Sequence, residues 1–168
     1  NVRAYDTGLT ASFTLKRLKL TDRSIVQQIT LGQINPLFKL LDGQTATIPE
    51  QNQGNLSPVD IDASAFFETA TLDSGFLDIS ISNNLPVKVK LVIFELTNAG
   101  DNSQVAYDSF TNIPIGGKVT KRIDLKNKTV TKTLKGSIKQ LSTEASSGPV
   151  LIDASKGVDL ELKVSRLH

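Results

Sequence analysis

The residue types that perform most enzyme chemistry are scarce in this sequence. Its 168 residues include no cysteine, and the one histidine, His168, is the last residue. A nucleophilic triad needs an imidazole that neighbouring groups hold in place, and zinc, copper and haem sites are built largely from histidine and cysteine. The sequence therefore predicts no catalytic residue of this kind, no such metal site and no cofactor.

Acidic side chains offer the remaining route to catalysis or to calcium binding. Asp60 and Asp62 are two residues apart, which places both carboxylates on one face of an extended chain. The glycine and distal glutamate of an EF-hand are missing, and no glycine-rich phosphate-binding motif occurs. We interpret the pair as part of a solvated acidic loop, and Asp73 and Asp101 as turn formers. The protein is thus predicted not to be an enzyme.

Charge is distributed unevenly, although the formal net charge is only +2. Residues 42–87 contain seven acidic residues and no lysine or arginine, whereas residues 118–139 contain eight basic residues and one acidic residue. Two predicted strands, at 118–125 and 133–141, carry most of these basic side chains. They define a candidate interaction surface: Lys118, Lys121, Arg122, Lys132, Lys135 and Lys139.

A positive surface of this kind fits an anionic glycan, an acidic lipid headgroup or a protein partner. Nucleic acid is not expected, because residues 118–139 contain no aromatic side chain to stack on bases. Two plainer interpretations stay open: the lysines face solvent and discourage aggregation, or the acidic segment lies beside them. Lys121 shares a strand face with Val119 and Ile123, so we expect it to snorkel, sit at a bulge or pair with an acid.

Apolar residues recur at every second position along much of the chain, as in strands with one buried face. The clearest segment contains Val158, Leu160, Leu162 and Val164. Residues 87–97 are apolar on both faces in their second half, which is typical of a central strand. We predict an all-β fold, an immunoglobulin-like β-sandwich of about seven strands with an additional N-terminal β-rich segment.

The alternation also predicts which residues form the core: Ile79, Ile81, Val89, Leu91, Ile93, Ile123, Ile138, Leu160 and Leu162. We place the sandwich domain at residues 59–168, and an N-terminal β-rich segment and loop at residues 1–58. Within that segment, residues 25–31 favour a strand, although a short helix fits the same pattern. The proline-bounded stretch 49–58 is interpreted as a long surface loop or a linker.

Residues 66–168 contain a run of short turn-like motifs. Gly75 to Val87 reads GFLDISISNNLPV, a long apolar strand follows, and Phe110 to Gly117 reads FTNIPIGG. This order resembles the late-embryogenesis-abundant type 2 (water-stress and hypersensitive-response) domain, which implies an immunoglobulin-like sandwich and brings no active site. It is also similar to uncharacterised envelope proteins of Bacteroidetes and, more distantly, to tubular lipid-binding proteins. Asn84 stands where the plant-type pattern has proline.

These features predict a non-catalytic structural or binding module of a cell-envelope or secreted protein, in an extracytoplasmic location. One alternative is a lipid or hydrophobic-ligand carrier with a groove between amphipathic strands, which a large lined cavity would favour. A second alternative is a glycan-binding module, which a shallow aromatic surface patch would favour. Tyr107 is a candidate for such a patch, but we expect it at the edge of the core.

Two further expectations concern the chain as a whole. No stretch of the sequence approaches the ~20 apolar residues that a membrane helix needs, so no transmembrane segment is expected. The chain begins at Asn1 rather than at methionine, so we expect a processed form or an excised piece.

Overall fold

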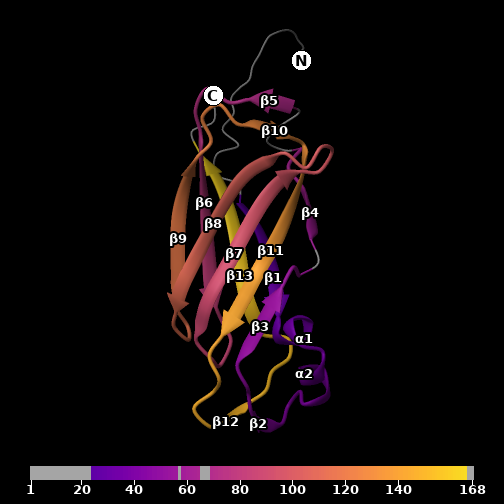
Figure 1. Ribbon diagram of the computed structural model, residues 1–168, viewed down its shortest axis with the longest axis vertical. Helices are drawn as coiled ribbons and strands as arrows, with labels where there is room; N and C mark the ends of the chain where they lie inside the picture. The colour runs from indigo at the N-terminus through magenta and orange to yellow at the C-terminus, as the bar shows by residue number, and fades with distance from the viewer. Residues whose placement is uncertain (1–23, 57, 65–68, 166–168) are drawn as a thin grey trace, which may run out of the picture.

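The computed structural model describes residues 24–56, 58–64 and 69–165, which form two antiparallel sheets packed face to face (Figure 1). The back sheet contains, in spatial order, β1 (Ser24–Thr30), β13 (Gly157–Ser165), β6 (Phe76–Asn83) and β9 (Lys118–Asp124). The front sheet contains β3 (Gln51–Gly54), β11 (Thr133–Thr143), β7 (Val89–Asn98) and β8 (Gln104–Ile113), and β4 (Val59–Asp62) also pairs with β11. The predicted all-β sandwich is confirmed.

Smaller elements cover the two ends of the sandwich (Figure 1). At the lower end of the view, β2 (Thr45–Thr47) pairs with β12 (Pro149–Leu151), beside the short helices α1 (Leu31–Ile34) and α2 (Leu37–Leu40). At the upper end, β5 (Thr69–Thr71) pairs with β10 (Thr129–Thr131). Most of the predicted strands are therefore present, and the helical turn follows the strand at 24–30 rather than replacing it.

The core lies between the two sheets and follows the period-two pattern of the sequence. Strands β13 and β6 pair in register through Leu160 and Ile81, and both side chains point into the core. Each fully buried side chain of this size contributes about 1.5–3 kcal/mol relative to leaving it exposed. The predicted core residues that are buried are Ile79, Ile81, Val89, Ile138, Leu160 and Leu162.

The core prediction was wrong for Leu91 and Ile93, which are only half-buried, whereas Ile123 is half-buried and packs against the core. On β7 the cause is a β-bulge at Lys90, where β7 has one more residue than the strand that it pairs with, β11. After the bulge, the side chains of β7 that point into the core are those of Val92, Phe94 and Leu96. Ile123 lies on β9, an edge strand of the back sheet that pairs with β6 alone.

A buried asparagine joins the lower ends of the strands at one side of the sandwich. Asn83, the last residue of β6, is inaccessible to solvent. Its side-chain amide donates to the carbonyl oxygens of Val87 (2.9 Å), Ile113 (3.1 Å) and Pro114 (3.2 Å), and its oxygen accepts from the Leu85 amide (2.9 Å). The NNLP segment, interpreted from sequence as a strand break, is thus held to β7 and β8 by this side chain.

The N-terminal part of the described chain is built into the sandwich. Strand β1 pairs along its whole length with β13, and Thr30 faces Gly157 across the two strands. A Cβ atom on Gly157 would lie 1.8 Å from the Ile29 carbonyl oxygen, so only glycine allows this approach. The linker interpretation of residues 49–58 was wrong in part, because Gln51–Gly54 forms β3. The domain boundary that we placed after residue 58 falls between β3 and β4, which both pair with β11.

Candidate binding site

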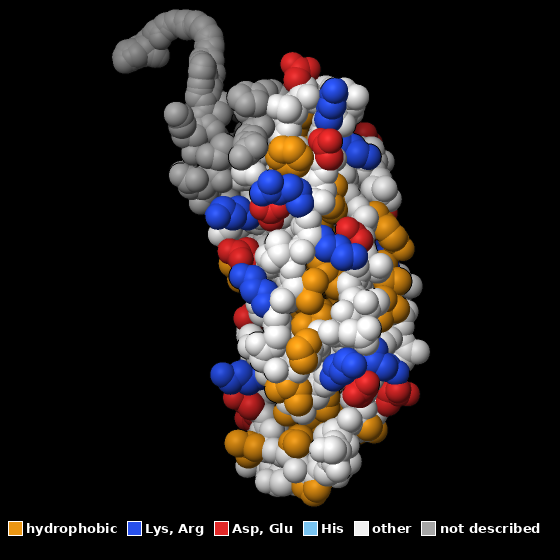
Figure 2. All heavy atoms as spheres, turned by 90° about the vertical axis from the view of Figure 1, so that its left-hand side faces the viewer, with side chains coloured by type: hydrophobic (Ala, Val, Ile, Leu, Met, Phe, Trp, Pro, Cys, Tyr) orange, Lys and Arg blue, Asp and Glu red, His pale blue; other side chains and the backbone are white. Residues whose placement is uncertain are grey.

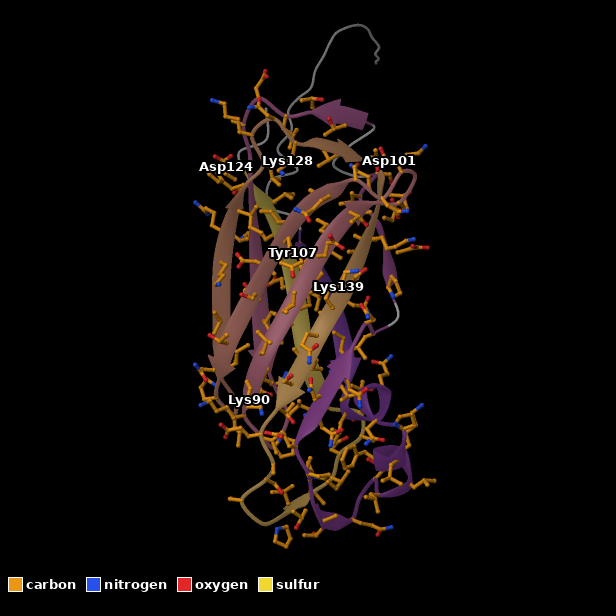
Figure 3. The ribbon with its side chains drawn as sticks, in the orientation of Figure 1. Lys90, Asp101, Tyr107, Asp124, Lys128 and Lys139 are labelled. Carbon is orange, nitrogen blue, oxygen red and sulfur yellow. The ribbon has the colours of Figure 1, made fainter. Side chains whose placement is uncertain are left out.

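The six basic residues of the candidate interaction surface lie on different parts of the sandwich. Lys118, Lys121 and Arg122 belong to β9 in the back sheet, whereas Lys135 and Lys139 belong to β11 in the front sheet. Strands β7 and β8 lie between these two groups in Figure 1, and Figure 3 shows Lys139 on β11. The sixth residue, Lys132, precedes β11. The structure does not gather the six residues on one sheet.

Acidic partners accompany most of these side chains. Arg122 forms a bidentate ion pair with Asp78, with 2.7 Å from Nε to Oδ1 and 3.0 Å from Nη2 to Oδ2. Lys118 lies 3.8 Å from Glu161, and Lys139 lies 3.4 Å from Glu95. Figure 2 shows the side of β9 with lysine and arginine side chains beside aspartate and glutamate. Of these acids only Asp78 belongs to the acidic segment 42–87, so the interpretation that this segment lies beside the bases accounts for the Arg122 pair alone. Anion binding by the surface stays a prediction.

Lys121 connects the two sheets at this side. Its ammonium lies 3.2 Å from the Asp108 carboxylate and donates to the Ser109 carbonyl oxygen on β8 (2.5 Å). The same ammonium lies 5.4 Å from the centre of the Phe110 ring, within reach of a cation–π interaction. The expectation that Lys121 pairs with an acid is confirmed. We call this side of the sandwich, between β8 and β9, the bridged edge.

The other candidate residues are placed on the surface. Asp60 and Asp62 lie on β4, and both are exposed. The pKa of Asp62 is lowered, first because its carboxylate accepts a hydrogen bond from the Ser64 side chain. Within residues 24–56, 58–64 and 69–165, no group of three His, Cys, Asp or Glu side chains could hold a metal ion. His168 lies outside the described residues.

Tyr107 does not lie at the edge of the core as predicted. Its side chain is 52% exposed on the outer face of β8 (Figure 3), where it pairs in register with Glu95. A register shift beside Leu96 leaves Val105 as an extra residue on β8, and both Val105 and Ala106 are buried. Alternation from Ala106 then directs Tyr107 outward.

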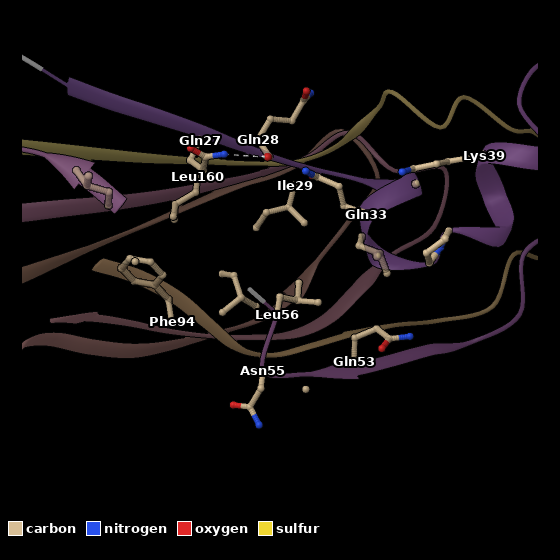
Figure 4. A pocket seen from close by; sticks show the side chains of 17 residues that line it. Gln27, Gln28, Ile29, Gln33, Lys39, Gln53, Asn55, Leu56, Phe94 and Leu160 are labelled. Carbon is tan, nitrogen blue, oxygen red and sulfur yellow. Dashed lines mark hydrogen bonds between the residues drawn. The ribbon is translucent and has the colours of Figure 1, made fainter. Parts of the chain in front are cut away.

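On the side opposite the bridged edge, the two sheets stand apart. Strand β1 forms the edge of the back sheet there, and β3 and β4 follow one another along the edge of the front sheet. A cavity of about 600 Å³ lies between them, bordered at one end by α1 and α2 (Figure 4). Cavities of roughly 300–1,000 Å³ hold small organic ligands. We call this side the open edge.

The floor of the cavity is apolar. Phe94, Ile138 and Leu160 lie there and are almost inaccessible to solvent, with exposures of 0%, 6% and 4%. Ile29 of β1 and Leu56, which follows β3, are half-buried and point into the space between the edge strands of the two sheets (Figure 4). The space between these two side chains is therefore lined by apolar groups.

Gln27 interrupts the apolar pattern on the inner face of β1. It shares that face with Ile25 and Ile29, while Val26 on the opposite face is 62% exposed. The Gln27 side chain lines the cavity, and its amide makes a long hydrogen bond of 3.4 Å to the Gln28 carbonyl oxygen. A polar side chain on the inner face of an edge strand can contact a ligand or discourage strand pairing.

A capping box fixes Gln33 at the mouth of the cavity. The Gln33 backbone amide donates to the Thr30 hydroxyl (3.2 Å), and the Thr30 backbone amide donates to the Gln33 side-chain oxygen (2.8 Å). This reciprocal pair begins α1 and satisfies two of its free amides. It also fixes which end of the Gln33 carboxamide is the oxygen, so that the NH₂ group points away from the Thr30 amide and can donate to a ligand.

Sequence reasoning missed this cavity, although two signals for it were present. A glutamine between Ile25 and Ile29 on a period-two strand is a polar residue on an inner face. Thr30 followed three residues later by Gln33 matches the capping-box pattern and predicts a helix start. The separation of β1 from β3 and β4 depends on the packing of whole sheets, which no local pattern encodes.

No protein-family model and no curated protein matches the chain. Among solved structures, the chain is similar to a carbohydrate-binding module from Cellvibrio mixtus lichenase 5A in complex with cellotriose. The identity is 12% over 84% of this chain and 98% of that chain, and the TM-score is 0.32.

The chain is also similar to two structures of infectious bursal disease virus. For the Gx strain the identity is 17% over 88% of this chain and 38% of the viral chain, with a TM-score of 0.31. For the Gt strain the identity is 15% over 88% and 39%, with a TM-score of 0.25. The chain thus spans about two-fifths of the viral chains, and TM-scores this low carry no argument about function.

Among the residues that the structure describes, no helix is long and apolar enough to span a membrane.

Proposed function

We propose that this protein is a non-catalytic binding module that takes a small ligand with an apolar part into the cavity of the open edge. The proposal corresponds to the carrier alternative of the sequence analysis. The observation that supports it is the cavity itself, with about 600 Å³ of space above a floor that includes Phe94, Ile138 and Leu160. A few polar side chains that line the cavity, among them Gln27 and Gln33, would orient the ligand.

The energetic basis is the removal of apolar surface from water. Each Å² of apolar surface buried contributes roughly 25 cal/mol, and the ligand, Ile29 and Leu56 would all lose solvent on binding. The floor residues are already buried and packed, so little side-chain freedom would be lost when a ligand arrives. Both terms favour binding in this place over the ion-paired surface of the bridged edge.

The glycan-binding alternative has less support from the described aromatic residues. Phe38, Phe94 and Phe110 are fully buried, and Phe76 lies under the Arg122 guanidinium, 5.0 Å from the ring centre. Tyr107 is the one described aromatic side chain with a large exposed surface. A single exposed ring gives no platform for successive sugar rings. The extracytoplasmic location stays a prediction.

The test uses the neutral apolar probe N-phenyl-1-naphthylamine, whose fluorescence rises in apolar sites. The probe should bind the parent protein with saturation. Ile29→Trp and Leu56→Trp, which fill the cavity from opposite walls, should abolish the signal. Val26→Trp places the same side chain on the outer face of β1 and should leave binding unchanged. Circular dichroism and thermal melting verify that each variant is folded.

Two results would contradict the proposal. One is the absence of saturable probe binding to the folded parent protein. The other is binding that survives both cavity-filling substitutions, because the probe would then lie elsewhere on the molecule.

A further inference from the structure

We infer that the ligand of the open edge carries an anionic head group, and that Lys39 and Gln33 bind this group at the mouth of the cavity. The inference rests on the proposed function and names the class of ligand: a small anionic amphiphile. Three independent features of the mouth support it: its charge, the position of Lys39 and the hydrogen-bonding capacity of Gln33.

The first feature is an unbalanced charge. Among the described residues that line the cavity, Lys39 is the only charged one, and the other polar side chains are neutral amides. A lysine ammonium offers three hydrogen-bond donors and no acceptor. The mouth therefore has one positive charge, with no acidic residue in the described lining to balance it.

The second feature is the way in which Lys39 is held against α1. A Cβ atom on Gly32 would lie 2.9 Å from Lys39 Cγ and 3.2 Å from Lys39 Cε. Glycine at this position thus lets the lysine stem lie flat across the first helix. In Figure 4 the Lys39 side chain points across the mouth toward Gln33. Both Lys39 and Gln33 are exposed, so their polar groups lie at the solvent-facing rim of the mouth.

The third feature is that the capping box leaves Gln33 as a donor. Its side-chain oxygen accepts from the Thr30 amide at 2.8 Å, and a backbone amide can only donate, which fixes the orientation of the carboxamide. The NH₂ group of Gln33 can then donate two hydrogen bonds to a ligand. Lys39 and Gln33 therefore both present donors at the same end of the cavity.

A pair of donors, one of them charged, is complementary to a group that only accepts hydrogen bonds. Carboxylates and phosphates have this property, and a hydrogen bond to an ionised group is roughly twice as strong as a neutral one. With the apolar floor, this specifies a slender apolar part joined to a carboxylate or phosphate. A fatty acid and an alkyl phosphate share this chemistry, so the experiment compares them.

The test measures the affinities of dodecanoate, dodecyl phosphate and dodecanol by titration calorimetry, in mildly alkaline buffer below their aggregation concentrations. We expect at least one of the two anions to bind roughly fivefold or more tightly than dodecanol, a difference typical of one partly exposed charge contact. Lys39→Gln should abolish this preference, and Lys39→Arg should retain it. The stronger of the two anions identifies the head group.

Two further variants separate a specific contact from general attraction. Lys126→Gln removes an exposed lysine that does not line the cavity, and should leave the preference unchanged. Gly32→Ala keeps the Lys39 charge but displaces its stem, and should weaken the preference in part. Salt should reduce the preference for the anion while leaving dodecanol binding nearly unchanged.

The outcomes distinguish this inference from the proposed function. If dodecanol and N-phenyl-1-naphthylamine bind in the cavity but the anions bind no tighter than dodecanol, the inference is overturned and the proposed function stands. A preference that persists in Lys39→Gln also overturns it. If none of the three amphiphiles binds and the neutral probe also fails, the proposed function itself is wrong.

Discussion

The two edges of this sandwich differ in whether side chains join the two sheets or leave a cavity between them. At the bridged edge, Lys121 reaches from β9 to Asp108 and the Ser109 carbonyl oxygen on β8, and the two sheets are joined. At the open edge, β1 and the β3–β4 pair stay apart and leave about 600 Å³ between them. One fold thus holds a side where a lysine joins the two sheets and a side with a cavity between them, and we propose the second as the ligand site.

The comparison also shows what charge does in each place. On the bridged edge, Lys118, Lys121 and Arg122 each lie beside an acidic side chain, so these bases are paired within the fold. At the open edge, a single lysine stands among amides and apolar residues. A lone charge in such surroundings is more informative about a partner than many charges with partners of their own.

The largest expected effect comes from closing the approach of β1 to β13. Gly157→Ala places a methyl group against the Ile29 carbonyl oxygen and should lower the free energy of unfolding by more than about 4 kcal/mol, since backbone must move. Urea denaturation measures this loss. Gly100→Ala is the control, because its added methyl meets nothing within 4 Å. Equal stability of the two variants would show that β1 is not firmly paired.

Core substitutions should reveal the open edge as a difference in cost. Ile81 and Leu160 face one another in register, but only Leu160 borders the cavity. Ile81→Ala opens a new closed void and should cost about 3–5 kcal/mol, whereas Leu160→Ala enlarges existing space and should cost about 2–3 kcal/mol. Denaturant midpoints test this order. A larger loss for Leu160→Ala would contradict the presence of the cavity.

The bridged side depends on the buried amide of Asn83. Asn83→Ala leaves the carbonyl oxygens of Val87, Ile113 and Pro114 without this donor and should cost about 2–3 kcal/mol. Its neighbour Asn84 is exposed, and its side chain makes one hydrogen bond, to Asp159, so Asn84→Ala should cost well under about 1 kcal/mol. Thermal melts of the two variants should differ clearly, and similar melting temperatures would refute the role of Asn83.

The smallest effect concerns the surface pair of Asp78 and Arg122. The hydrogen bond from Arg122 lowers the pKa of Asp78 below its ordinary value of 3.8. The pair therefore stabilises the fold above that value, and its contribution is lost as the pH falls through the lowered pKa. Because Arg122 is exposed, Asp78→Asn should shift the melting temperature at neutral pH by at most about 2 °C. The shift should vanish in strong acid, and a shift that persists there would assign it to another cause.

The sequence predicted the sandwich because alternation is a local signal that survives in every strand. Ile79, Ile81, Leu160 and Leu162 were assigned to the core for this reason. Alternation failed where the structure inserts an extra residue: the bulge at Lys90 moved Leu91 and Ile93 out of the core. Bulges depend on the partner strand, so a single strand pattern does not reveal them.

The candidate site was less accessible to sequence reasoning. The basic segment stood out because its charges lie close together in sequence. The fold distributes them over two sheets and pairs Lys118, Lys121, Arg122 and Lys139 with acidic side chains. The capping-box pattern of Thr30 and Gln33 predicts a helix start but no cavity, and the neighbours of Lys39 and Gln33 in the cavity come from β3, β7, β11 and β13. Such a site exists only after long-range pairing has brought these strands together.

The most direct test of the central claim is a comparison of the two edges in one experiment. Backbone amide resonances of the isotope-labelled protein are followed by nuclear magnetic resonance while N-phenyl-1-naphthylamine is added. The account predicts shifts at Gln27, Ile29 and Leu56 around the cavity, and none at Asp108 or Lys121 on the bridged edge. Shifts that instead gather along β9 and the outer face of β11, with the cavity amides unmoved, would contradict it.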